Sequence, residues 1–319
     1  MLTTPILLIT FNRPNHVRQV LEEIRKQQPA QMFVCQDGAR EGNKLDEERV
    51  QQVRDVINEL VDWPCELHTL YQEKNLGCGP GPAAGITWFF EHVEMGIIME
   101  DDCLPHPDFF GYCEELLHRY KDSEEIVFIN TTLYDDRWKC KFSYDFSHYM
   151  VAGAWASWAR ALKGFDLDLL NMNAKAFRKR LKQVVYSRAE YDWWYFKVLE
   201  IQQDTKKKYY WDYQMLIHIY NIGGVTIIPS KNLVSNIGFD AEGTNTLCDD
   251  GRGNRPVFGI LPLTHPNRVH VDKKRDYLCF AKAYSRGWIR DSISYIYRSM
   301  YYSRDWRYKL LMWYKRLKK

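Results

Sequence analysis

Apolar positions recur with two different spacings along the first 130 residues. Residues 5–10, "PILLIT", form a short and almost unbroken apolar run that is typical of a buried strand. In the next segment the apolar side chains stand three and four positions apart, as in an amphipathic helix: Val17, Val20, Leu21 and Ile24. A strand that leads directly into a helix predicts the opening of a βαβ unit.

The same alternation continues to about residue 132. Apolar runs that predict strands lie at 31–38, 65–71, 96–100 and 125–132, and helical stripes lie around 50–60, 82–93 and 107–120. This order predicts an α/β fold, a Rossmann-like, mainly parallel sheet flanked by helices. Ligands of such sheets bind at the carboxyl ends of the strands, so the segments "TFNRP", "CQDGAR" and "MEDDC" are the candidate ligand-binding positions.

Beyond about residue 135 the pattern becomes aromatic and irregular. This second half does not repeat the first, and we expect it to complete the ligand site. No linker composition separates the two halves, so residues 1–275 are interpreted as one domain and residues 276–319 as a basic, aromatic helical extension.

The acidic triplet Glu100, Asp101 and Asp102 directly follows an apolar strand. Three adjacent carboxylates repel one another, so they need either solvent or a cation among them. A solvated turn is one interpretation, and other acidic doublets occur at residues 135–136 and 249–250. The position of this triplet at a predicted strand end favours a second interpretation, a metal site. In such a site Mg²⁺ or Mn²⁺ is held by carboxylates together with substrate phosphates.

The other two strand ends are compatible with a nucleotide-diphosphate ligand. Arg13 is a planar cation suited to phosphate, and Asp37 can accept a hydrogen bond from the N–H of a nucleobase. Taken singly, Arg13 is more simply interpreted as a surface arginine and Asp37 as a turn aspartate. The glycine-rich segment 77–85 is either a tight loop before a helix or a place where a ligand approaches the backbone; neither a GxGxxG after the first strand nor a Walker sequence occurs.

Charge and cysteine content narrow the class of protein. The formal net charge is +3, but residues 286–319 carry ten Lys and Arg against only Asp291 and Asp305. The eight cysteines form no CxxC pair, which favours reduced thiols in a cytoplasmic compartment. No apolar run approaches the roughly 20 residues that a membrane span requires, and "PILLIT" is expected to be a strand rather than a signal peptide.

The basic C-terminal segment interleaves Lys and Arg with Trp, Tyr, Leu and Met. Such a pattern is typical of helices that lie on an anionic membrane surface, and it predicts peripheral association with the inner face of the plasma membrane. A helical extension packed on the domain is the simpler alternative. Nucleic acid is not expected as a partner, because the rest of the chain is acidic.

Several of these segments together resemble the GT-A nucleotide-diphospho-sugar glycosyltransferases. The resemblance rests on the order of the following pieces over residues 4–246: "FNRP", "CQDG", "IIMEDDCLPHPDFF", "AGAWASW", "WDYQ" and "SNIGFDAEGT". The similar families are the N-glycan β-1,2-N-acetylglucosaminyltransferases and bacterial family-2-like enzymes. The resemblance implies a UDP-sugar donor, a glycan or lipid-linked acceptor, and Mn²⁺ or Mg²⁺.

The resemblance also implies roles for individual residues. Asp102 would bind the metal, Glu100 and Asp101 would contact the donor sugar or ribose, Asp37 would meet the uracil and Arg13 the phosphates. A further residue, Asp212 in "YWDYQ", falls at the place of the catalytic base. Its alternative interpretation is a helix N-cap.

Two other functions are weighed against an inverting glycosyltransferase. A sugar-phosphate nucleotidyltransferase would use a similar sheet and similar carboxylates, but no glycine-rich, basic loop follows the first strand. A non-catalytic carbohydrate-binding protein would account for the many Trp and Tyr residues, but not for the acids at the strand ends.

Overall fold

The computed structural model describes residues 1–133, 135, 137–203, 210–239 and 253–284. Its first half follows the predicted alternation closely: β1 (Ile6–Thr10), α1 (Pro14–Gln27), β2 (Gln31–Gln36), α2 (Lys44–Leu60), β3 (Glu66–Tyr71), α3 (Pro80–His92), β4 (Met95–Glu100), β5 (Cys103–Pro105), α4 (Asp108–Arg119) and β6 (Ile126–Asn130). Each predicted strand and helix of this region is present, because apolar spacing in the sequence matches one buried face per element.

The second half contains regular elements where the sequence reads as irregular. They are β7 (Tyr144–Ser147), β8 (Ala154–Trp158), the 3₁₀ helix η1 (Ala159–Leu162), α5 (Ala174–Val184), α6 (Arg188–Gln203), α7 (Asp212–Ile222), β9 (Val225–Pro229), β10 (Val234–Asn236) and α8 (Lys273–Ala283). All five residues of β8 are buried. A strand enclosed on both faces shows no alternation of apolar and polar residues, which explains why the pattern does not reveal it.

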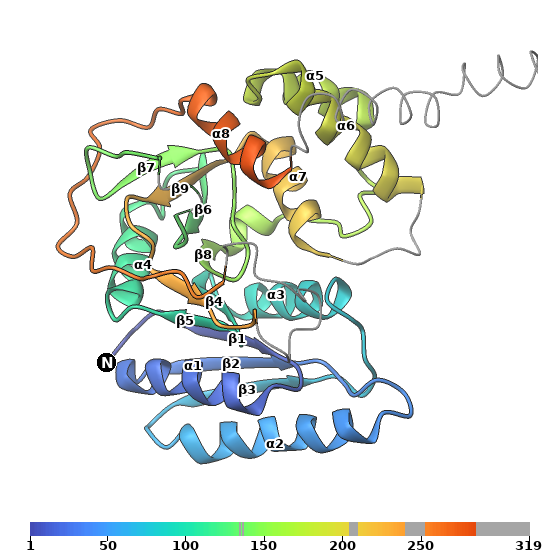
Figure 1. Cartoon of the computed structure of the whole chain (residues 1–319), viewed down its shortest axis with the longest axis vertical. Helices are drawn as coiled ribbons and strands as arrows, with labels where there is room; N and C mark the ends of the chain where they lie inside the picture. Colours follow the sequence, from blue (N-terminus) through green and yellow to red (C-terminus); the bar gives the residue numbers. More distant parts are fainter. Residues whose placement is uncertain (134, 136, 204–209, 240–252, 285–319) are drawn as a thin grey trace, which may run out of the picture.

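One sheet of eight strands runs through the molecule in the order β3-β2-β1-β4-β8-β6-β9-β7 (Figure 1). The strands from β3 to β4 are parallel to one another, β8 is antiparallel to both of its neighbours, and β9 is parallel to β6. The predicted mixed, mainly parallel sheet flanked by helices is therefore confirmed. β10 and β5 form a separate antiparallel pair.

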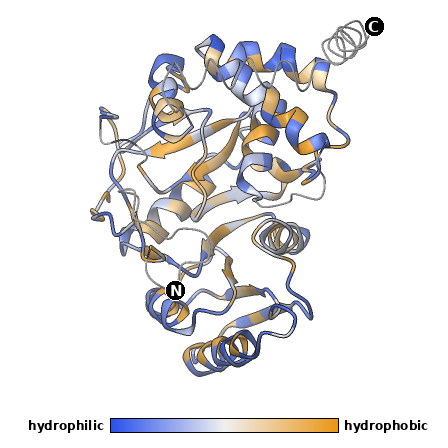
Figure 2. Cartoon of the chain, turned by 45° about the vertical axis from the view of Figure 1, so that its right-hand side comes forward, coloured by the Kyte–Doolittle hydropathy of each residue, from blue (hydrophilic) through white to orange (hydrophobic). Residues whose placement is uncertain are grey.

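Helices cover both faces of this sheet (Figure 2). Buried apolar side chains form two clusters, one on each face. Side chains of β1 alternate between the layers: Ile6 and Leu8 pack with α1, α2 and α4, whereas Leu7 and Ile9 pack with α3 and the helices of the second half. The central strands are therefore held from both sides, and their carboxyl ends have a fixed position. Within the described residues, no helix is long and apolar enough to cross a bilayer.

The reversed strand β8 brings the second half to the carboxyl edge of the sheet. Its first residue, Ala154, pairs with Met99 near the end of β4. The backbone N–H of Glu100 then donates to the carbonyl of Gly153 at 2.9 Å. Gly153 has φ +115°, a conformation that favours glycine, and a Cβ there would lie 2.9 Å from Cys103 Sγ.

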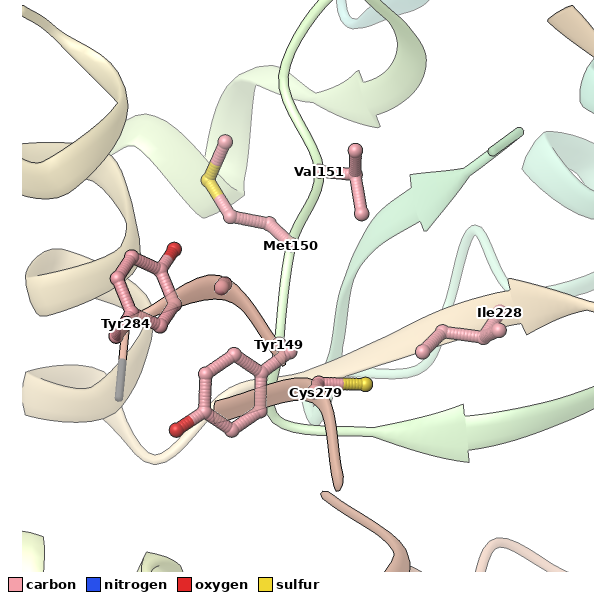
Figure 3. A pocket seen from close by; sticks show the side chains of 7 residues that line it. Tyr149, Met150, Val151, Ile228, Cys279 and Tyr284 are labelled. Atoms are coloured by element: carbon pink, nitrogen blue, oxygen red, sulfur yellow. The ribbon is translucent and has the colours of Figure 1, made fainter. Parts of the chain in front are cut away.

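Helix α8 is joined to the sheet by a buried carboxylate. Asp276 accepts hydrogen bonds from Ser147 Oγ at 2.5 Å and from the backbone N–H of His148 at 2.9 Å. Cys279 and Tyr284 of the same segment line a small cavity of about 10 Å³ beside Ile228 of β9 (Figure 3).

The predicted domain boundary at residue 275 falls inside α8. Residues 285–319 of the predicted extension lie outside the described residues, so the division into domain and extension remains a prediction.

The burial of Asp276 predicts a pH-dependent stability. Burial, against hydrogen bonds from Ser147 and His148, raises the pKa of Asp276 to about 7. Between pH 4 and pH 7 the unfolded chain ionises this group while the folded chain keeps its proton, so stability falls as the pH rises through this range. We expect Asp276→Asn to lose this dependence, so that its Tm improves relative to the wild-type Tm between pH 5 and pH 8.

Thermal unfolding of both proteins across this range tests the assignment. Parallel Tm curves for the two proteins would contradict the raised pKa.

Candidate active site

The acids at the end of β4 are held by an arginine from the end of β1. The guanidinium of Arg13 forms ion pairs with Asp101 and with Asp102, the second at 3.1 Å between Nη1 and Oδ2. All three side chains are largely buried, with exposed fractions of 14% for Arg13, 4% for Asp101 and 13% for Asp102. Three of the residues predicted for the site therefore converge at one edge of the sheet.

The convergence follows from strand register. Ile9 of β1 pairs with Glu100 of β4, so the residues that follow each strand leave the sheet side by side. The backbone N–H of Phe11 donates to Asp101 Oδ2 at 3.3 Å. Asn12 is held in turn, because its Nδ2 donates to Asp46 Oδ1 at the start of α2 at 2.7 Å. The β1–α1 turn is thus held by the acid that follows β4 on one side and by the start of α2 on the other.

A third segment closes on the same acids. Asn236 of β10 pairs with Cys103 of β5, and the N–H of Ile237 donates to the carbonyl of Asp102 at 2.8 Å. A Cβ on the next residue, Gly238, would lie 2.4 Å from Asp102 Oδ2 and 2.8 Å from Arg13 Nη1. Any other residue at position 238 would have to displace these charged side chains. In the sequence, the "SNIG" segment was a candidate only through the family resemblance.

The pKa values at this site reflect burial and mutual repulsion. Burial, then the charges of Asp102 and Asp101, raise the pKa of Glu100 to about 8, although Arg13 opposes the shift. Burial also raises the pKa of Asp101, against the attraction of Arg13. Burial disfavours the charged form of Arg13, but the two aspartates outweigh this and hold its pKa above the ordinary range.

Asp212 is the first residue of α7 and lies near this acidic group. Its charge is among those that raise the pKa of Glu100, so the two carboxylates lie within electrostatic range. The position is set by aromatic packing, because Trp211 stacks on Trp155 of β8 at 5.8 Å between ring centroids. The structure therefore places Asp212 near the acidic triplet, although the two are far apart in the sequence.

The helix-cap interpretation of Asp212 is only partly matched by the structure. Trp211 occupies the N-cap position, and Asp212 is the first residue inside α7. Its Oδ1 accepts the N–H of the adjacent residue, Tyr213, at 2.9 Å. A carboxylate in the first turn favours the helix electrostatically, so a structural contribution exists beside any chemical one.

The carboxylate of Asp37 is surrounded by hydrogen-bond donors, most of them from the loop that precedes α3. Its Oδ1 accepts from the N–H groups of Gly38 and Leu76, and its Oδ2 accepts from Gly77 N–H and from Asn75 Nδ2, all within 2.8–3.0 Å. Burial raises the pKa of Asp37, and the backbone N–H groups of Leu76, Gly77 and Gly38 oppose this shift. Asp37 organises the loop that precedes α3, and a nucleobase contact remains a prediction.

Hydrogen-bond anchors that the sequence pattern did not reveal also shape the site. Asn130, at the end of β6, donates to the carbonyls of Tyr149 and Ile227 and accepts the N–H of Val151 at 2.6 Å. Thr131 donates to the carbonyl of Ala154 at 2.6 Å. The only sequence signal for Asn130 and Thr131 was their position where a strand ends. Polar residues are common at such positions, so this signal did not single them out.

The described residues hold no group of three or more His, Cys, Asp and Glu side chains that could bind a metal without other ligands. An open groove of about 380 Å³ lies along α3 and is lined on the facing side by Phe165 and Leu167; its lining includes Glu91 but none of the acids of the candidate site. The candidate site is therefore the group of ion-paired acids at the carboxyl edge of the sheet, and neither this groove nor the small cavity beside α8 includes any of them.

The hydrogen bonds of Asp37 predict a stability effect. We expect Asp37→Ala to lower the free energy of unfolding by about 2–4 kcal/mol, because four donors lose their acceptor in a half-buried loop. Urea denaturation measures the change. Asn171→Ala, which removes a side-chain donor from an exposed turn, is the control and should change stability by less than about 1 kcal/mol. An unaffected Asp37→Ala protein would contradict the proposed loop-organising role.

Comparison with known proteins gives no family assignment. No family model and no curated protein matches the chain. Similar solved structures include HddC from Yersinia pseudotuberculosis (11% identity, 50% of this chain, 78% of that chain, TM-score 0.31), a UDP-glucose pyrophosphorylase complexed with UDP-glucose (12%, 47%, 64%, 0.27) and the galactosyltransferase LgtC in complex with donor and acceptor sugar analogues (10%, 59%, 68%, 0.30). TM-scores this low support no argument about function.

Proposed function

We propose that the chain is an inverting, metal-dependent glycosyltransferase that moves a hexose or N-acetylhexosamine from a UDP-sugar to an acceptor hydroxyl. The observation that carries the proposal is the convergence of Arg13, Asp101 and Asp102 at one sheet edge, with Asp212 approaching from the second half of the chain. The family resemblance of the ordered sequence segments agrees with this chemistry. The acceptor would be a glycan or a lipid-linked oligosaccharide.

The residues present fit a divalent cation that is completed by substrate. Asp102 offers hard oxygen ligands at a strand end, and the glycine at position 238 keeps the space beside its Oδ2 free of a side chain. One carboxylate with substrate phosphates is a common way to bind Mg²⁺ or Mn²⁺. Such an ion would stabilise the negative charge of the leaving diphosphate.

Arg13 has two possible uses in this scheme. In the ligand-free protein its guanidinium neutralises the two aspartates. A diphosphate offers the same planar cation an alternative set of oxygens. We therefore expect Arg13 to exchange carboxylate for phosphate partners when donor binds, which frees Asp102 for the metal.

Asp212 would remove the proton of the acceptor hydroxyl. Inversion in a single displacement needs one general base and no covalent partner on the enzyme. The carboxylate is half-buried and follows Trp211, whose ring is fixed against Trp155. This support limits its movement, which is what a base that must meet one hydroxyl requires.

The nearest competing function is a sugar-phosphate nucleotidyltransferase. Both reactions use a nucleotide sugar, but they differ in the second substrate. Incubation of the protein with UDP-sugar and Mn²⁺, with either a glycan acceptor panel or pyrophosphate, separates them. Release of UDP supports the proposal, whereas formation of UTP would favour the nucleotidyltransferase.

The metal role of Asp102 predicts a specific loss. We expect Asp102→Ala to reduce activity at least 10³-fold while the Tm changes little, because Arg13 keeps its ion pair with Asp101. Asp135→Ala is the matched control, since Asp135 is also a buried acid with an arginine partner, Arg137. Initial rates of UDP release measure both variants. An equal loss of activity in the two variants would contradict the assignment of the metal role to Asp102 on the basis of its position at a strand end.

The base role of Asp212 predicts a loss of turnover without a loss of donor binding. We expect Asp212→Asn to lower kcat about 10²- to 10⁴-fold while the Kd for UDP-sugar with Mn²⁺ and the Tm stay near wild type. Asp192→Asn is the control, because Asp192 is an acid of α6 that pairs with Arg188. If the Asp212→Asn protein kept full turnover, or if it failed to fold, Asp212 would have a structural role at the start of α7 in place of the role of base.

A further inference from the structure

Helix α5 carries one sign of charge only. Its eleven residues contain five Lys and Arg and no Asp or Glu. The apolar side chains Phe177, Leu181 and Val184 are buried against the domain. The opposite side carries Lys175, Lys179 and Lys182, which are four and three positions apart and all exposed. We call these three lysines the α5 lysine row.

Within the described parts of the chain, the α5 lysine row forms no ion pair with an acidic side chain. Other exposed cations do: Arg18 pairs with Glu59 and Arg25 with Asp62. Helix α2 shows the usual surface, where Lys and Arg alternate with Asp and Glu. A helix with only positive charge on its solvent side repels itself, so its composition needs a reason beyond solubility.

Exposed apolar side chains stand at both ends of α5. Leu170, before the helix, is 63% exposed, and Tyr186, after it, is 54% exposed. The ring of Tyr186 lies 5.9 Å from that of Tyr277 in α8. Lysines flanked by exposed leucine and tyrosine are typical of surfaces that lie in a membrane interface, where charges meet headgroups and apolar groups enter the acyl boundary.

The same surface continues onto α8. Lys273 Nζ, at the start of α8, donates to the carbonyl of Gln183, at the end of α5. The two helices lie at the same end of the molecule (Figure 1). Lys274 of α8 is exposed beside this contact. The positive region therefore spans two helices rather than one.

Charge is distributed unevenly between the residues before α5 and those of α5 and α6. Residues 1–173 contain 16 Lys and Arg against 28 Asp and Glu, whereas residues 174–203 contain seven against three. An acidic body with one basic end is attracted to an anionic surface in one orientation only. A long nucleic acid would meet the acidic body on either side of this end, so a flat anionic surface is the better match.

We propose that the α5 lysine row, with Leu170, Tyr186 and Lys274, is a docking surface for the headgroups of an anionic lipid bilayer. This contact is separate from the acidic site at the sheet edge and does not depend on the proposed reaction. It is also distinct from membrane binding by residues 285–319, because it lies in the described domain.

Vesicle co-sedimentation of the full-length chain tests this docking surface. We expect binding to vesicles of phosphatidylcholine with 30% phosphatidylglycerol that weakens with NaCl, and little binding to phosphatidylcholine alone. Lys175→Gln, Lys179→Gln and Lys182→Gln together should reduce partitioning roughly a hundredfold, at about fivefold for each lysine. Leu170→Ser with Tyr186→Ser should reduce the part of the binding that resists salt.

A control variant distinguishes a local surface from net charge. Lys44→Gln, Lys121→Gln and Lys141→Gln remove the same charge from exposed positions elsewhere and should leave partitioning within about twofold. Thermal unfolding of each protein verifies that the fold is kept. Equal loss in both triple variants, no effect of the α5 substitutions, or binding of single- or double-stranded DNA in place of vesicles would overturn the proposal.

Discussion

The balance of charge around Arg13 is the constraint on which the candidate site depends. A buried strand that ends in three carboxylates is unfavourable unless a cation compensates it. Arg13 supplies that cation from the neighbouring strand, and its position depends in turn on Asn12, which is tied to Asp46. The site is therefore assembled before any ligand arrives. When substrate and metal bind, they would replace contacts that Arg13 already makes. The mutually repelling acids are already close together, so binding does not have to bring them together.

The first half of the fold could be predicted because each element has one buried face. In α1 the apolar residues stand at helical spacing, and all of them are buried. β8 could not be predicted in this way, since Trp155 and its neighbours are enclosed on both sides. Its antiparallel direction depends on pairing with β4 and β6, which are distant in sequence, and no local pattern carries that information.

The candidate site was predictable to a similar extent. Arg13 and Asp102 follow strands that the pattern identifies, and parallel strands bring their ends together. Asp37 also follows such a strand, but its carboxylate is directed to the amides of the loop before α3, which depends on backbone positions that the sequence pattern does not show. Gly238 was expected only from the resemblance, because its closeness to Asp102 results from pairing between β10 and β5.

The two ends of the eight-stranded sheet differ in a way that bears on self-association. β7 forms one edge, and its Phe146 also bridges to Val271, so part of that edge is covered by the chain itself. β3 forms the other edge, and each of its residues keeps some exposed surface. An open edge of this kind is a template for strand addition by another molecule. Glu66 and His68 place polar groups along β3, which makes the stacking of strands into fibrils less favourable at this edge of the sheet.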